Sequence, residues 1–96
     1  LKKVKQVVTI PVIIKLGKYI SNMPALVNQL KANGADGVVL FNRFYQPDID
    51  LNTMQLVSGN VFSSHSDLSD TIRWTAIVSG KIPNISIASS TGVHDC

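Results

Sequence analysis

The segment from Val7 to Leu16 constrains the fold most, because it is an apolar run rich in β-branched residues whose few polar positions do not alternate. Such a run predicts a strand that is covered on both faces, as in a parallel sheet. Pro11 sets the start of this strand, since proline is tolerated at the first residue of a strand but not in its middle. The rest of the fold is therefore expected to supply layers on both sides of it.

A helix and a second strand are expected next. Ser21 and Asn22 are candidate N-caps, and the early Pro24 costs nothing because the first helical amides have no partner within the helix. Gly34 is expected to end the helix in a left-handed conformation. Its buried stripe is predicted to be Leu26, Val27 and Leu30. The apolar stretch Gly37–Phe41 then reads as a second buried strand, which completes a strand-helix-strand unit.

After Phe44 the pattern breaks for about twenty residues, which is long for a connection in a compact domain and suggests a functional loop. Alternation around Ile49, followed by the apolar Leu56 and Val57, indicates a short hairpin. A further amphipathic helix is predicted from Ser66 to Gly80, with Leu68, Ile72 and Ala76 on one face and Trp74 packed. The segment Asn84–Ala88 is then predicted as a third strand, and Ser89 to Gly92 as a turn of small residues.

Strands that alternate with helices imply parallel pairing in an α/β fold, either a barrel or an open doubly wound sheet. Eight strand-helix units take about 250 residues, so 96 residues hold about three of them. We therefore predict that residues 1–96 are a fragment of a single domain, namely a partial (β/α)8 TIM barrel with about three parallel strands. Its free edges and apolar faces predict that it oligomerises, most simply as a homo-oligomer, or is poorly behaved alone.

Composition excludes several classes. Hydrophobic residues make up 45% and charged residues 16%, which is typical of a globular domain. Apolar stretches fall far short of the roughly 20 residues that cross a bilayer, so no membrane association is expected. Three of the nine basic residues cluster at the start of the chain, and only Arg43 is flanked by aromatics, so no nucleic-acid partner is expected. The single cysteine, Cys96, suits a reducing compartment, and the cytoplasm is favoured.

Polar residues follow the predicted strands, where α/β folds collect their chemistry. Lys15 is either a cation at the floor of a pocket or a side chain that reaches solvent from a strand end. Asn42 has donors and an acceptor for a planar ring, but it is also a common turn former. The turn that ends in Thr91 and Gly92 offers amides to a phosphate, although serine-rich turns are common for other reasons. His65 and His94 are expected in surface loops, and no metal site is predicted.

Three segments carry a family resemblance: Ile10–Leu16 (IPVIIKL), Ala32–Asp50 (ANGADGVVLFNRFYQPDID) and Ser90–Asp95 (STGVHD). In this order they resemble the dihydroorotate dehydrogenase-like flavoproteins. The middle segment is the most specific, because neither fold nor charge dictates its sequence from Asn42 to Asp50. The resemblance implies an FMN-binding (β/α)8 barrel of roughly 300 residues, of which this chain is the central to late part.

The resemblance also implies residue roles. Lys15 matches a lysine beside the flavin pyrimidine ring, where its charge stabilises the anionic reduced flavin. Asn42 matches an asparagine that hydrogen-bonds substrate or flavin. Thr91 and Gly92 match the turn whose amides hold the FMN phosphate or ribityl chain. Such enzymes oxidise dihydroorotate to orotate with a base from an earlier loop, and no residue here matches that base, so no catalytic residue is assigned.

Two other functions stay open from the residues alone. One is a phosphate-binding barrel of another chemistry, in which the turn before Val93 binds a ligand without a flavin. The other is a non-catalytic interaction fragment, because an incomplete barrel has apolar surface to bury against partners.

Overall fold

A computed structural model describes residues 1–43, 46–59 and 64–95 of the chain. The helices are α1 (Lys2–Val7), α2 (Met23–Ala32) and α3 (Leu68–Lys81), and a short 3-10 turn, η1 (His65–Asp67), precedes α3. The strands are β1 (Ile13–Gly17), β2 (Gly37–Asn42), β3 (Pro47–Asp50), β4 (Gln55–Ser58) and β5 (Ser86–Ser89). None of the helices in these described ranges is long and apolar enough to cross a membrane.

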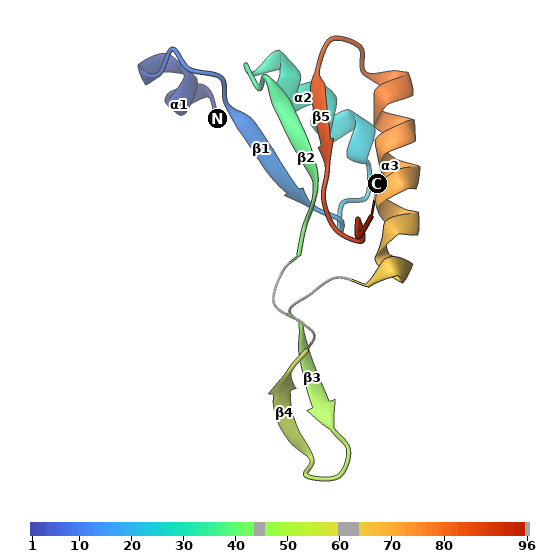
Figure 1. Ribbon diagram of the computed structural model, residues 1–96. Helices are drawn as coiled ribbons and strands as arrows, with labels where there is room; N and C mark the ends of the chain where they lie inside the picture. The colour runs from blue at the N-terminus through green and yellow to red at the C-terminus, as the bar shows by residue number, and fades with distance from the viewer. Residues whose placement is uncertain (44–45, 60–63, 96) are drawn as a thin grey trace.

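The main sheet has the order β1-β2-β5, and both of its pairings are parallel (Figure 1). In its register Lys15 lies opposite Val39, and Val39 lies opposite Ala88. This arrangement confirms an α/β fold with three parallel strands and intervening helices. It is compatible with part of a (β/α)8 barrel, but three strands do not close one.

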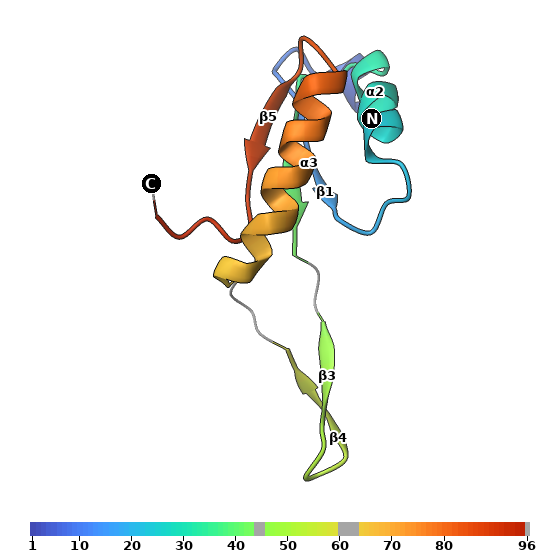
Figure 2. The ribbon, with the colours of Figure 1, turned by 90° about the vertical axis from the view of Figure 1, so that its right-hand side faces the viewer.

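Helices α2 and α3 contact each other and cover one face of the sheet, as Figures 1 and 2 show. The core between them and the sheet is completely buried at Met23, Val27, Val38, Leu40 and Val78. The prediction that β1 is covered on both faces is wrong for this chain. Leu16 is buried, whereas Ile13 is 58% exposed and Lys15 is exposed, because helices lie on only one side of the sheet.

The expected start and end of the first long helix are confirmed. The side chain of Asn22 accepts a hydrogen bond from the amide of Ala25 at 3.1 Å, and Gly34 follows the helix with a φ of +101°. The buried stripe begins earlier than predicted, because Met23 is fully buried alongside Val27. Leu26 and Leu30 are partly buried and pack against the same core.

Helix α3 turns a different face to the sheet from the one predicted. Thr71 and Val78 are buried and Trp74 packs on the core, whereas Ile72 is 57% exposed. Steps of four residues drift around a helix that has 3.6 residues per turn, so Leu68, Ile72 and Ala76 do not form a single contact line. The line that meets the sheet follows the steps of three and four from Thr71 through Trp74 to Val78.

Two further segments frame the sheet. The basic start of the chain forms the short helix α1, and the ammonium of Lys5 in it lies 3.0 Å from the Asp36 carboxylate, just before β2. At the other end, β3 and β4 form the expected antiparallel hairpin. The hairpin extends away from the carboxyl ends of the main strands (Figure 1), and the molecule measures 51 × 30 × 26 Å.

Candidate functional site

The carboxyl edge of the main sheet holds a pocket. All three main strands run in the same direction, so their carboxyl ends and the loops that follow them meet at one edge. The pocket is lined from the loop after β1, the end of β2, the first turn of α3 and the turn after β5. Its lining residues are Lys18, Tyr19, Phe41, Asn42, Arg43, Gln46, Asp67, Asp70, Thr71 and Thr91.

Two of the residues singled out from the sequence, Asn42 and Thr91, lie together in this pocket. Asn42 is the last residue of β2 and is half-buried. The Thr91 hydroxyl donates a hydrogen bond to the carbonyl of Phe41 at 3.0 Å, so this side chain ties the turn after β5 to the end of β2. The single hydrogen of this hydroxyl is therefore already used, and a donor from Thr91 to a ligand would be its backbone amide.

Backbone hydrogen bonds strengthen the same junction. The amide of Ser90 donates to the carbonyl of Leu40 at 2.6 Å, and the amide of Phe41 donates to the carbonyl of Ser90 at 2.7 Å. These two bonds carry the pairing with β2 one residue beyond the end of β5. The turn after β5 is thus fixed to β2 rather than left as a free loop.

Helix α3 holds the turn from the other side. Thr71 is buried, and its hydroxyl donates to the carbonyl of Thr91 at 2.9 Å. Gly92 is buried with a φ of +82°, and a Cβ added to it would lie 2.3 Å from the amide nitrogen of Leu68. Gly92 therefore packs against the start of α3, and it does not line the pocket.

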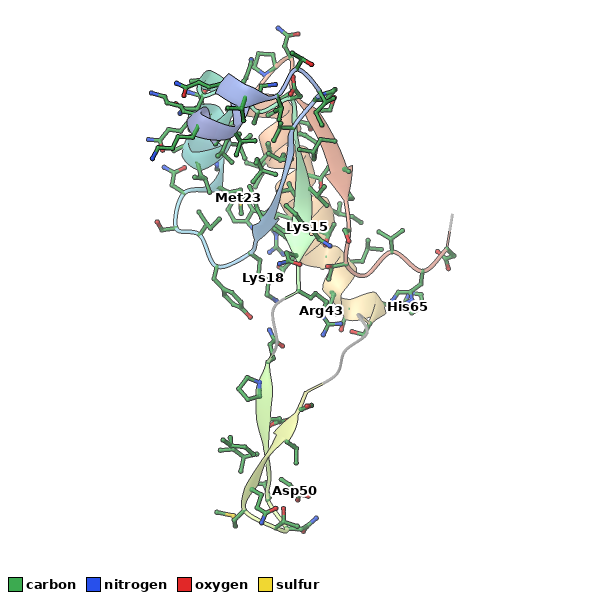
Figure 3. All side chains as sticks on the ribbon, turned by 90° about the vertical axis from the view of Figure 1, so that its left-hand side faces the viewer. Lys15, Lys18, Met23, Arg43, Asp50 and His65 are labelled. Atoms are coloured by element: carbon green, nitrogen blue, oxygen red, sulfur yellow. The ribbon has the colours of Figure 1, made fainter. Side chains whose placement is uncertain are left out.

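Lys15 lies elsewhere, on the open face of the sheet. Ile14 and Leu16 pack into the core beneath the helices, so the alternation of the strand directs Lys15 to the opposite face. There it shares a row with Val39 and Ala88. Figure 3 views the molecule from this side and shows Lys15 in front of the strands, with α3 behind them. The structure thus brings Asn42 and Thr91 into one pocket, and sets Lys15 outside it.

Charged residues that the sequence analysis did not single out line the pocket. Asp70 lies 3.8 Å from the Lys18 ammonium, and its other carboxylate oxygen accepts from Arg73 at 3.0 Å. The amide of Ser64 donates to Asp67 at 2.9 Å, and this bond, together with the positive charges of Arg43 and Lys18, lowers the pKa of Asp67.

The pocket wall therefore carries both signs of charge. Asp67 and Asp70 stand at the start of a helix, where acidic residues are common because they interact favourably with the helix dipole. Their positions in the sequence therefore did not indicate a pocket.

His65 and His94 are both exposed, and their rings meet. The ring centroids of His65 and His94 are 4.4 Å apart with an angle of 41° between the planes. Within residues 1–43, 46–59 and 64–95, no group of three or more His, Cys, Asp or Glu side chains is placed to hold a metal ion. Cys96 lies outside the described residues.

Comparison with known proteins shows a distant and partial relationship. A segment of 59 residues, 62% of this chain, is 34% identical to the catalytic subunit of dihydroorotate dehydrogenase B (NAD(+)) from Listeria monocytogenes serotype 4a (strain HCC23). The subunits of the same name from Listeria innocua serovar 6a and Listeria welshimeri serovar 6b are 34% and 32% identical over the same length. The match spans 19% of each of these relatives. No protein-family model matches the chain.

Proposed function

We propose that this chain is a segment of a flavin-dependent oxidoreductase of the dihydroorotate dehydrogenase type, and that residues 1–96 are the central to late part of one FMN-binding (β/α)8 barrel. The partial match to dihydroorotate dehydrogenase B supports the relationship. The parallel order β1-β2-β5, with helices on one face only, supports the barrel. The substrate we propose is dihydroorotate or a related small molecule, and the compartment is the cytoplasm.

The observation that carries the proposal is the position of Lys15. In a (β/α)8 barrel the helices form the outer ring, so the sheet face without helices is the barrel interior. Lys15 is exposed on that face and has the register of Val39 and Ala88 on the neighbouring strands. A lysine inside a closed barrel is costly to bury unless its ammonium meets an anion or a ligand. A bound flavin is such a partner.

The residues of this chain fit FMN unequally. Lys15 is exposed on the open face, and its positive charge suits contact with an electron-rich ring. Asn42 offers an amide at the end of β2 for substrate or flavin. Thr91 fits through its backbone, since its hydroxyl is bonded to Phe41. Gly92 packs on the start of α3 and does not line the pocket, so its packing does not support the contact with the FMN phosphate that the resemblance implies.

The division of chemistry follows from these roles. Bound FMN supplies the hydride acceptor for oxidation of the substrate. Lys15 supplies a fixed positive charge that favours added negative charge on its partner. Asn42 orients a planar ring through its amide donors and acceptor. The proton acceptor for the substrate comes from a part of the protein beyond this segment.

The test is a set of lysine variants in the complete protein that carries this chain. We expect Lys15→Ala to lower FMN retention, read as flavin absorbance per protein, or to slow flavin reduction by dihydroorotate in a single turnover. Lys15→Arg keeps the charge and should restore part of the loss. Lys81→Ala, at the exposed end of α3, is the matched control and should behave as the wild type.

Two results would overturn parts of the proposal. Unchanged flavin content and reduction rate in Lys15→Ala would remove Lys15 from the site. A wild-type protein that stays colourless after reconstitution with FMN would favour a phosphate-binding barrel of another chemistry.

A further inference from the structure

His65 and His94 form a pair of imidazoles at the carboxyl edge of the main sheet. Their ring centroids lie 4.4 Å apart, and the ring planes are tilted by 41°. Both residues are exposed, and neither lines the pocket. Figure 3 shows His65 at the start of α3. The proposed flavin site uses neither ring, so the pair is open to another role.

The packing beside the pair holds both segments in place. Gly92 packs against the start of α3, and the Thr71 hydroxyl donates to the Thr91 carbonyl at 2.9 Å. His94 follows this turn directly, and His65 lies in the 3-10 turn that leads into α3. Ligands that are held in position before binding lose little conformational freedom when they bind. The two imidazoles are therefore preorganised for a shared partner.

Carboxylates flank both histidines along the chain. Asp95 follows His94 and is exposed. Asp67 belongs to the turn of His65, where its carboxylate accepts from the amide of Ser64 at 2.9 Å. Negative charge close to a site attracts cations and repels anions. The surroundings of the pair thus favour a cation over a phosphate or another anion.

Imidazole chemistry narrows the class of cation. Neutral imidazole is a ligand for zinc, copper and nickel, whereas magnesium and calcium prefer oxygen ligands. Zinc binds an imidazole nitrogen at about 2.0–2.1 Å, so two imidazoles on one ion have ring centres about 4.5–5 Å apart. The distance between the rings of His65 and His94, 4.4 Å, is close to this range.

We propose that His65 and His94 together bind one divalent transition-metal ion, such as Zn²⁺ or Cu²⁺. Water or another part of the complete protein fills the remaining coordination positions. With two ligands from this chain, the site exchanges its ion more readily than a structural site with four protein ligands. The bound ion joins the turn before α3 to the segment after β5. This inference does not depend on a flavin.

The test titrates Zn²⁺ into the complete protein by calorimetry, in a Cys96→Ser background that removes the neighbouring thiol. We expect one binding site whose affinity falls at least tenfold in His65→Ala and equally in His94→Ala. Asn28→Ala, on the exposed side of α2, is the matched control and should bind Zn²⁺ as the background protein does. Mg²⁺ in place of Zn²⁺ should give no binding that depends on the two histidines.

Electron paramagnetic resonance with Cu²⁺ covers the case in which a histidine variant fails to fold, because it needs no substitution at the pair. One equivalent of Cu²⁺ bound to the background protein should show splitting from two imidazole nitrogens. A background protein that binds no Zn²⁺, or a Cu²⁺ spectrum without imidazole nitrogen, overturns the inference. Unchanged Zn²⁺ affinity in either His65→Ala or His94→Ala overturns the shared site.

Discussion

Gly92 and Leu68 approach each other so closely that no side chain fits between them. A Cβ placed on Gly92 would lie 2.3 Å from the amide nitrogen of Leu68 and 2.6 Å from its Cα. Real contacts of a Cβ with backbone atoms are longer, and the φ of Gly92, +82°, is also one that residues with a side chain rarely adopt. The turn after β5 therefore packs on the start of α3 through Gly92. The neighbouring Thr91 lines the pocket, so this packing helps to fix the pocket wall.

We expect Gly92→Ala to lower the free energy of unfolding of the complete protein by about 2 kcal/mol or more, from the left-handed backbone and the clash together. Denaturant unfolding followed by circular dichroism measures this. Gly80→Ala is the control, since nothing lies within 4 Å of an added Cβ there. Because alanine favours a helix over glycine, Gly80→Ala should be neutral or stabilise by up to about 1 kcal/mol. Equal effects of the two substitutions would contradict the packing described for Gly92.

The buried hydroxyl of Thr71 gives a second prediction. It donates to the carbonyl of Thr91 at 2.9 Å, and Thr71→Val keeps the shape of the side chain while it removes this donor. The carbonyl then loses a partner in a half-buried place, which costs about 1–3 kcal/mol of unfolding free energy. Thr53→Val in the exposed turn of the hairpin should change stability by less than about 0.5 kcal/mol. A Thr71→Val protein as stable as the wild type would show that the hydroxyl is not needed to hold the turn.

Much of the fold follows from local sequence signals. Proline or glycine lies near the ends of several elements, and the apolar run of β2 has the length and position expected of a buried parallel strand. Strand β5 starts at Ser86 rather than at the predicted Asn84, and it is mostly exposed. The buried face of α3 could not be predicted from local signals, because Thr71 is polar. Its burial goes with a hydrogen bond to a turn about twenty positions further along the chain. The meeting of His65 with His94 also depends on tertiary packing, which spacing along the chain does not encode.

The candidate site was predictable only in part, for a similar reason. The strand ends identified Asn42 and Thr91 because parallel strands bring their carboxyl ends together. Lys18 and Asp70 come from the loop after β1 and from the first turn of α3, and their proximity depends on how that helix sits on the sheet. No pattern within either segment indicates it.

The cap of α2 gives a third prediction. The sequence offers Ser21 and Asn22 as caps, and the structure uses Asn22, whose side chain accepts from the Ala25 amide. Asn22→Ala should lower the free energy of unfolding by about 0.5–2 kcal/mol, because one amide of the first turn loses its acceptor. Ser21→Ala should have little effect. Thermal unfolding of the two variants side by side separates them, and a larger loss for Ser21→Ala would contradict the assigned cap.

Asp36 links helix α1 to the sheet and gives a prediction about pH. Its carboxylate accepts from the amide of Val12 at 2.8 Å and from the Lys5 ammonium at 3.0 Å. The bond from Val12, followed by that from Lys5, lowers the pKa of Asp36 below its ordinary value of 3.8. A carboxyl whose pKa is lower in the folded state stabilises the fold above its unfolded pKa, and this contribution is lost as the pH falls through the folded pKa.

Asp36→Asn should therefore be less stable than the wild type at neutral pH, and the difference should shrink as the pH falls below 3.8, the ordinary pKa of this carboxyl. Denaturant unfolding at a series of pH values measures it. Asp95→Asn, in the exposed segment after β5, is the control and should keep the pH dependence of the wild type. Because the bond from Val12 is the larger cause, Lys5→Met should remove only the smaller part of the pH dependence. A larger effect for Lys5→Met than for Asp36→Asn would mean that the ammonium, and not the backbone amide, holds this carboxylate in its ionised form.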